Sequence, residues 1–320
     1  MSKKDHIDEH KDEKALEAGL SYLLAQQRDG LWPYIASKQA ALEPSCWAAI
    51  ALSDNDKCAN HFVETLLASQ NRDGGWSNES ARLDSDWSTG AAVLALRHLL
   101  EKSQGAGLKL RTSADDLQSA CQKAEDWLLD NRAEYYSSAA KFALLLWKGP
   151  EHDYARGWPW TQNTFDWVEP TSYVLLSLRY SVNSNRAAVN KAVDFAENFL
   201  LKLVCVNGGW NFGDRNPYGS GNPPDVQSTA MALLALKTRR QENKVRQSIK
   251  WMLEKMAKTE SVSQSAWIAL TLCAYQENCD ELLTQLKGTQ NSDGSFSTNL
   301  LTHAIACLSL QARKDPACIA

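Results

Sequence analysis

The sequence lacks the excess of basic residues that binding to a nucleic acid needs. Its 320 residues include 34 Lys and Arg against 38 Asp and Glu, so the formal net charge at pH 7 is −4. Proteins that bind a phosphate backbone displace its counterions with a basic face. The composition therefore gives no support to a nucleic acid as a partner.

Closely spaced metal-ligating or redox cysteines are also missing. The eight cysteines are scattered, mostly within apolar segments, and none forms a Cys-x-x-Cys pair. This spacing predicts buried, reduced thiols in a cytoplasmic protein, in place of a disulfide framework or a zinc knuckle. Since an Asp-Asp-x-x-Asp run is absent too, we expect no metal ion and no other cofactor.

No run of about 18 uncharged apolar residues occurs, so the sequence predicts no membrane span. The segment 1–14 is highly charged and has no apolar core, unlike a signal peptide. We expect a charged flexible tail at 1–14 and a single domain at 15–320. Peripheral contact with a membrane, a protein partner and a homodimer all stay open.

What the sequence does contain is a glycine–aromatic turn that recurs along its length, at 26–32, 70–76, 157–160, 208–210 and 290–296. Self-similarity at a period of roughly 40–55 residues indicates stacked supersecondary units that bury one another's apolar faces. The turn glycines supply the positive φ that reverses the chain. We expect the aromatic ring that follows to wedge between helices, as at Trp76, Trp210 and Phe296.

Two kinds of helix alternate between these turns. Amphipathic segments predict outer helices at 14–27, 57–70, 114–131, 186–204, 243–258 and 279–288. Segments that are apolar almost all round predict buried inner helices at 43–53, 86–101, 169–181, 225–238, 262–276 and 300–312. This alternation predicts an all-α fold, an (α/α)6 toroid, with one inserted helix at 137–148. Long loops at 149–168 and 211–224 are typical of functional sites.

Acidic residues stand at the beginnings of several predicted inner helices: Glu43, Asp84, Asp86, Glu169 and Asp225. Inner helices of a toroid run in the same direction, so their beginnings and the positive ends of their dipoles meet at one mouth of the ring. Aromatic residues within about one turn of these acids are expected to line an apolar hollow beneath them. Helix capping is the alternative role for each acid taken singly.

These repeats resemble those of the superfamily of squalene–hopene cyclases and protein prenyltransferase β-subunits. Gln-x-x-Asp-Gly-x-Trp is similar to the glutamine–tryptophan motif of that superfamily, and 263–270 resembles a cyclase inner helix. The likeness covers nearly the whole chain after residue 14. It implies a small single-barrel member that acts on an isoprenoid.

Class II cyclases of this superfamily protonate an alkene or epoxide with the middle Asp of Asp-x-Asp-Asp-Thr-Ala. The stretch in register here is 225–230, where Gln227 and Ser228 replace the two critical carboxylates. Glu43 and Glu169 occupy the register of the middle Asp in their own repeats. The resemblance therefore implies a substitute acid.

Protein prenyltransferases instead bind zinc through Asp, Cys and His. His303 lies near the position of their His, but the partnering Asp-x-Cys is absent, because 225–227 reads Asp-Val-Gln. Zinc needs at least three protein ligands. We therefore predict no zinc, and expect His303 to be a hydrogen-bonded residue of the cavity wall.

Under the cyclase interpretation, Asp86 and Glu169 are the candidate general acids, since burial or a like-charged neighbour raises the pKa of a carboxyl group. Asp84 is the crowding neighbour of Asp86, and Glu43 and Asp225 orient the acids. An apolar, isoprenoid-like substrate, whose carbocation aromatic rings stabilise, is expected to contact the remaining candidates: Trp47, Trp87, Trp160, Trp167, Tyr173, Gln227, Trp267 and His303.

Such an enzyme is an isomerase or a lyase, but two other functions stay open. The helix dipoles stabilise ionised carboxylates, which suits general base work or cation binding. The altered acid motif favours a non-catalytic binding protein or partner subunit on the same toroid. Paired carboxylates with tryptophans also fit a carbohydrate-active (α/α)6 enzyme.

Overall fold

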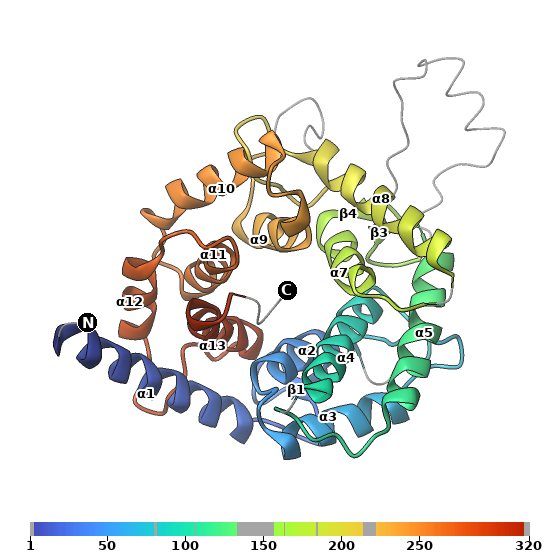
Figure 1. Cartoon of the computed structure of the whole chain (residues 1–320), viewed down its shortest axis with the longest axis horizontal. Helices are drawn as coiled ribbons and strands as arrows, with labels where there is room; N and C mark the ends of the chain where they lie inside the picture. The colour runs from blue at the N-terminus through green and yellow to red at the C-terminus, as the bar shows by residue number, and fades with distance from the viewer. Residues whose placement is uncertain are drawn as a thin grey trace.

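The computed structural model describes residues 3–79, 82–105, 107–132, 157–162, 164–183, 185–213 and 222–316, with side chains from residue 13 onward. Within this part of the chain, the helices form two concentric rings around one axis (Figure 1). The outer helices are α1 (Lys3–Ala25), α3 (Asp56–Ala68), α5 (Ala114–Asp130), α8 (Arg186–Leu203), α10 (Asn243–Met256) and α12 (Asp280–Gly288). The inner helices are α2 (Leu42–Ala51), α4 (Ser88–Gln104), α7 (Val168–Arg179), α9 (Val226–Ala235), α11 (Val262–Ala274) and α13 (Leu300–Lys314).

The predicted (α/α)6 toroid is confirmed. Each inner helix packs against the next, and α13 packs against α2, which closes the inner ring. The outer ring closes where α1 meets the turn between α12 and α13. There the side chain of Gln290 donates a hydrogen bond of 2.8 Å to the carbonyl oxygen of Ala15.

Burial follows the sequence pattern that separates the two rings. Every residue of α2 is buried, because this helix has neighbours on all sides. In α10, by contrast, the buried residues Val245, Ile249 and Met252 recur on one face, while Lys250 is exposed. In the described part of the chain, none of the helices is both long and apolar enough to cross a membrane.

Each turn tryptophan joins an outer helix to the inner helix that follows it. The indole N–H groups donate to outer-helix carbonyl oxygens at 2.7–2.8 Å: Trp32 to Leu23, Trp76 to Leu66, Trp158 to Leu128 and Trp210 to Leu200. Trp76, Trp210 and Phe296 are at most 3% exposed. The prediction that these rings act as structural wedges is therefore confirmed.

Glycine at these turns is required by both the backbone conformation and the space. Gly294 has a φ of 89°, in the left-handed region that glycine favours. A Cβ atom at this position would lie 2.6 Å from the carbonyl oxygen of Ala18 in α1. The turn therefore lies directly against the first outer helix, where the ring closes.

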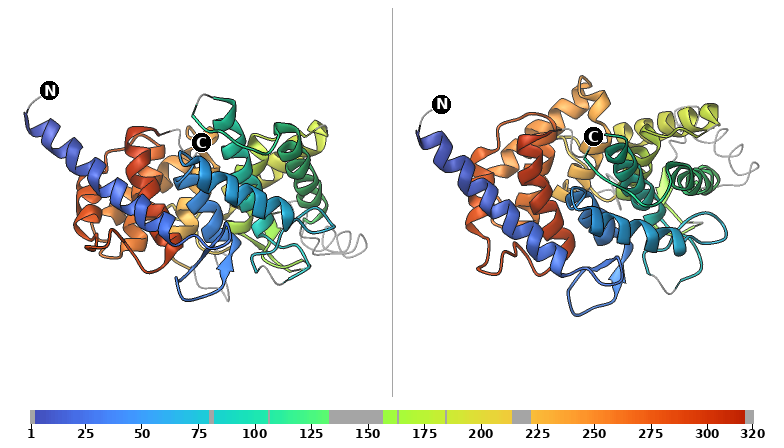
Figure 2. Two further views of the ribbon diagram at one scale, coloured as in Figure 1. Left: turned by 90° about the horizontal axis from the view of Figure 1, so that it is seen from below. Right: turned by 60° about the horizontal axis from the view of Figure 1, so that its bottom comes forward.

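Two small antiparallel sheets, which the sequence did not predict, precede α2 and α7. Strand β1 (Trp32–Pro33) pairs with β2 (Ala40–Ala41), and β3 (Trp158–Pro159) pairs with β4 (Asp166–Trp167). Figure 2 shows β1 and the loop after it projecting from one face of the ring. These sheets lead directly into the two inner helices that carry a glutamate in the first turn.

The segment 1–14, predicted as a flexible tail, is helical from Lys3 onward and forms the first part of α1. Its lysine and glutamate residues are good helix formers, and the helix continues into the amphipathic segment. The helix predicted at 137–148 lies outside the described residues. The loops predicted at 149–168 and 211–224 are described only in part.

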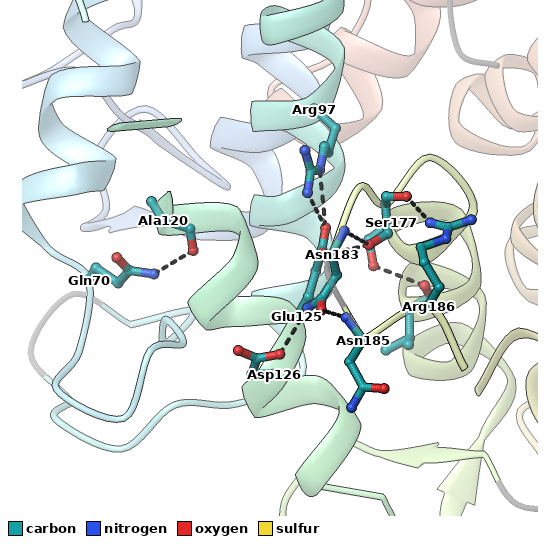
Figure 3. Close-up of polar contacts among 11 residues, drawn as sticks. Gln70, Arg97, Ala120, Glu125, Asp126, Ser177, Asn183, Asn185 and Arg186 are labelled. Carbon is teal, nitrogen blue, oxygen red and sulfur yellow. Dashed lines mark hydrogen bonds and ion pairs between the residues drawn. The ribbon is translucent and has the colours of Figure 1, made fainter. Parts of the chain in front are cut away.

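A buried ion pair, which sequence reasoning missed, joins the two rings on the α4–α5 side. Arg97 of α4 donates two hydrogen bonds, of 3.1 and 2.7 Å, to one carboxylate oxygen of Glu125 in α5. Ser181, in the loop before α8, donates to the other oxygen at 2.6 Å. Figure 3 shows Arg97 and Glu125 pointing toward one another, with Asn183 and Arg186 beside them. Because every charge in it is hydrogen-bonded, the cluster orients α5 against α4.

The Trp210→Ala substitution tests the wedge function of the turn tryptophans. We expect a loss of about 3–5 kcal/mol in the free energy of unfolding, because the indole is fully buried. Trp210→Phe keeps most of the apolar contact but leaves the Leu200 carbonyl unsatisfied, at a cost of about 1–3 kcal/mol. Chemical denaturation measures both, with Val206→Ala as the control, since Val206 is 91% exposed. Equal stability of Trp210→Ala and the control would contradict the wedge.

Candidate active site

A repeated hydrogen bond sets the register of the inner helices. A hydroxyl group near the start of the helix accepts a hydrogen bond from the backbone N–H of the preceding turn tryptophan, at 2.7–2.9 Å. The pairs are Ser45 with Trp32, Thr89 with Trp76, Thr171 with Trp158, and Thr229 with Trp210. The residues two positions before these hydroxyls are therefore equivalent, and they are Glu43, Trp87, Glu169 and Gln227. They lie at one mouth of the ring, where the inner helices begin.

Glu43, in the first turn of α2, is held by two phenolic hydroxyl groups. Tyr34 donates to one carboxylate oxygen at 2.5 Å, and Tyr173 of α7 donates to the other at 2.8 Å. The side chain is only 6% exposed, and this burial raises its pKa, although both hydrogen bonds act in the opposite direction. Glu43 is thus a buried acceptor that links α2 to α7 across the mouth.

Trp47, one turn further along α2, spans the axis of the ring. Its indole N–H donates to the hydroxyl oxygen of Tyr173 on α7 at 2.8 Å, and its ring meets Trp267 of α11 edge to face at 5.5 Å. Within the inner ring, α2 packs mainly against α4 and α13. The partners of Trp47 lie instead on α7 and α11, which are not neighbours of α2. The three side chains are at most 2% exposed. They fill the hollow that was predicted to lie open beneath the acids, and that prediction was wrong.

Glu169, at the equivalent position of α7, is neutral at physiological pH. The side chain is 9% exposed, and burial, followed by the nearby charges of Glu43 and Asp225, raises its pKa to about 8. Its one hydrogen bond within the described residues, from the Ser228 hydroxyl at 3.2 Å, opposes this shift weakly. Glu169 therefore holds a proton in the range where an unperturbed carboxyl group has lost it.

Asp225 is the N-cap residue of α9, and its carboxyl group lies near that of Glu169. One carboxylate oxygen accepts a hydrogen bond of 2.9 Å from the backbone N–H of Ser228. The other oxygen is buried and finds no hydrogen-bond partner among the described residues. It adds an incompletely compensated acceptor to the mouth, which favours protonated neighbours.

Asp86 has the contacts of a helix cap. Its carboxylate accepts hydrogen bonds from the backbone N–H and hydroxyl of Ser88, at 2.9 and 2.7 Å, and from the backbone N–H of Asn78 at 3.0 Å. With donors on both oxygens, Asp86 is a capping acceptor at the start of α4. Asp84 is exposed and lines a groove of about 750 Å³ on the outside of the ring. Asp84 thus lies away from the Glu43–Glu169 pair, whereas Asp86 is linked to Glu43 through Asn78, which binds both residues.

The other aromatic candidates lie around the start of α7: Trp87 and Trp160 line a small pocket with Pro170, the residue after Glu169, and Trp167 is the N-cap residue of α7. Trp87 meets Trp160 edge to face at 4.5 Å and lies 5.6 Å from the ring of Tyr173. Trp160 and Trp167 are half-buried, as is Gln227 at the head of α9. These side chains form an aromatic surface outside the filled centre.

His303 serves the closure of the ring. Its Nδ1 accepts a hydrogen bond from the backbone N–H of Phe296 at 3.0 Å, and its Nε2 lies 2.8 Å from the carbonyl oxygen of Gly19 in α1. The expected hydrogen bonding is confirmed. However, both ring nitrogens are used by the backbone, so the predicted contact with a substrate has no free group to make it. Among the described residues, no group of three or more His, Cys, Asp and Glu side chains is placed to hold a metal ion.

Sequence reasoning missed two residues of this site, Tyr34 and Asn78. Asn78 accepts a hydrogen bond from the backbone N–H of Glu43 at 3.0 Å, and its amide lies 3.4 Å from the hydroxyl of Tyr34. A signal for Tyr34 existed, because Trp-Pro-aromatic occurs at 32–34 and again at 158–160. Both copies precede a glutamate-headed inner helix.

No protein-family model matches the chain, and no curated protein matches it. Solved structures match its fold over almost the full length. Type II terpene cyclase MstE from Scytonema, in a variant bound to its substrate geranylgeranyl dihydroxybenzoate, is 15% identical with a TM-score of 0.63, covering 96% of this chain and 98% of that chain. The apo form of the cyclase is 13% identical, with a TM-score of 0.61 and coverage of 97% and 99%. A protein from Actinoplanes is 16% identical, with a TM-score of 0.61 and coverage of 95% and 99%. The toroid therefore has the fold of a single-barrel terpene cyclase.

The raised pKa of Glu169 predicts a pH dependence of stability. Between about pH 4.5 and 8, the native state retains a proton that the unfolded chain has released, so the free energy of unfolding falls as the pH rises. One such proton accounts for a slope of up to about 1.4 kcal/mol per pH unit. Glu169→Gln should flatten this slope in denaturation curves recorded from pH 5 to 8. The exposed Glu254→Gln is the control. An unchanged slope in Glu169→Gln would show that Glu169 ionises normally.

Proposed function

We propose that this protein is a terpenoid cyclase-like enzyme, in which the Glu169 carboxyl group protonates an isoprenoid or a similar apolar substrate. The observation that carries this proposal is a buried carboxyl group with a pKa of about 8, beside a surface of half-buried tryptophan rings. A general acid works best with a pKa near the operating pH. Glu169 meets that condition, whereas both carboxylate oxygens of Asp86 are engaged in capping contacts with Ser88 and Asn78.

The proposed reaction needs no co-reactant. Glu169 transfers its proton to one carbon of an alkene, which leaves a carboxylate at Glu169 and a carbocation in the substrate. A second alkene of the same molecule attacks the cation and closes a ring. Loss of a proton from the final cation, with return of a proton to Glu169, completes an isomerisation.

The surroundings of Glu169 suit both the protonation of the alkene and the carbocation that it produces. The faces of Trp87, Trp160 and Trp167 offer cation–π stabilisation to the carbocation. Burial, followed by the nearby carboxyl groups of Glu43 and Asp225, raises the pKa of Glu169 and so favours the protonated starting state. Because Trp47 fills the centre of the ring, the substrate lies on the aromatic surface of the mouth and not in a hollow beneath it.

The fold comparison supports the substrate class. MstE binds geranylgeranyl dihydroxybenzoate as substrate and merosterolic acid A as product. It shares the toroid with this chain at 14–15% identity. An isoprenoid chain is accordingly the first substrate class to test.

A non-catalytic binding protein is the second candidate, and specific observations favour it. Gln227 and Ser228 stand where the cyclase motif has its critical carboxylates. The centre of the ring is also closed by Trp47, which is fully buried. A carbohydrate-active enzyme has less support, because both carboxylate oxygens of Glu43 are occupied by tyrosine hydroxyl groups.

A pair of variants tests the proposed acid. The protein is incubated with geranylgeraniol and with geranylgeranyl dihydroxybenzoate, and products of unchanged mass are detected by chromatography and mass spectrometry. Glu169→Gln should lower turnover at least about 100-fold while the melting temperature changes little, since the amide cannot donate a proton to an alkene. Asp86→Asn should instead replace one of the two acceptor oxygens that bind Ser88 and Asn78 by an NH2 group, at a cost of about 1–3 kcal/mol in the free energy of unfolding, and keep turnover.

The contrast between the two variants decides the outcome. Loss of turnover in Asp86→Asn at unchanged stability would move the acid to Asp86. Loss of stability alone in both variants would assign both residues to capping. Absence of turnover in the wild-type protein, with either compound bound, would favour the binding protein.

A further inference from the structure

A second cavity opens at the other mouth of the ring, where the inner helices end. It has a volume of about 580 Å³, within the range of small-molecule sites. Ile50 near the end of α2, Leu308 of α13 and Tyr180 after α7 line it, together with Leu16 and Leu20 of α1. Trp47 lies between this cavity and the Glu43 carboxylate on the same helix. The cavity is therefore a separate compartment from the candidate active site.

The apolar side of this cavity continues into a trough along α1. A neighbouring groove of about 420 Å³ shares Leu16 and Leu20 with the cavity and extends past Leu24. These three leucines recur every four residues and so lie on one face of α1. Leu24 is 37% exposed, so the trough is open to solvent at this end. Leu16, Leu20 and Leu24 thus form a continuous apolar stripe along the trough, and such a stripe suits the hydrocarbon chain of an amphipathic molecule.

The polar rim of the cavity carries no spare positive charge. Its lining includes two lysines, and each is paired: Lys102 with Asp54 at 2.7 Å, and Lys314 with Glu13 at 2.9 Å. Three acidic residues of the lining, Asp54, Glu101 and Asp315, outnumber these lysines.

A histidine of the rim adds no charge either. Burial, and then the charge of Lys102, lowers the pKa of His98 to about 4, so its imidazole is neutral. An anionic head group would thus meet a net negative rim. Ser53, which is buried, accepts a hydrogen bond from Lys102 at 2.9 Å and lies 3.3 Å from the imidazole of His98, so an uncharged head group meets a polar rim whose lysine is already bound.

We propose that this cavity binds an amphipathic small molecule with a linear apolar chain and an uncharged, hydroxyl-type head group. The chain lies along Leu16, Leu20 and Leu24, and the head group lies at the rim near His98 and Tyr180. The site is distinct from the Glu169 mouth and does not depend on its chemistry.

Geranylgeraniol, an isoprenoid alcohol, is the probe, and geranylgeranyl diphosphate is its charged counterpart. The full-length protein is mixed with each compound, passed over a gel-filtration column and analysed for bound ligand by mass spectrometry. We expect this cavity to retain about one geranylgeraniol per chain, in addition to any bound at the Glu169 mouth, with at least about tenfold weaker retention of the diphosphate. Leu20→Glu and Leu16→Glu, which place a carboxylate in the trough, should each lower the affinity for geranylgeraniol at least about tenfold.

Leu83→Glu is the matched control, since Leu83 is 88% exposed and lies outside the cavity, and it should bind as the wild-type protein does. Glu169→Gln should also keep full binding, which separates this test from that of the proposed acid. Circular dichroism confirms folding, and Leu24→Glu replaces any trough variant that unfolds. The proposal is wrong if the wild-type protein retains no geranylgeraniol, if folded trough variants bind it normally, or if the diphosphate binds equally well.

Discussion

The architecture depends on the contacts that each turn tryptophan makes with two helices at once. Its indole N–H binds a carbonyl oxygen of the outer helix, while its backbone binds a hydroxyl group of the next inner helix. Each contact is fully buried, so breaking it would leave polar groups without water. Repeated around the ring, for example at Trp76 and Trp210, the contact forces the inner helices to begin at the same level.

Aligned helix beginnings explain the electrostatics of the mouth. Glu43 and Glu169 come from inner helices that are not neighbours, yet both face the axis at one level. Burial raises the pKa of both carboxyl groups, and the two tyrosine hydroxyl groups oppose this shift at Glu43. Glu169 has only a weak hydrogen bond from Ser228, and its pKa is raised to about 8. A shared scaffold thus brings two buried carboxyl groups with different hydrogen-bond partners to one mouth.

Trp47 divides the interior of the ring into two parts. On one side lie the acids and the half-buried tryptophans, and on the other lies the apolar cavity beside α1. A toroid of this size has room for an open central chamber, but here large aromatic side chains close the axis. This packing stabilises the ring and directs any ligand to one of the two mouths.

The amino-acid sequence by itself determined the helices, their alternation and the register of the inner ring, because hydrophobic periodicity and turn glycines are local signals. It also placed Glu43 and Glu169 at equivalent positions. Only the tertiary structure decided that Asp86 caps a helix, that Trp47 crosses the axis and that Tyr34 binds Glu43. These properties arise from contacts between residues far apart in the chain. Burial and charge, which set the pKa of Glu169, exist only once the ring has closed.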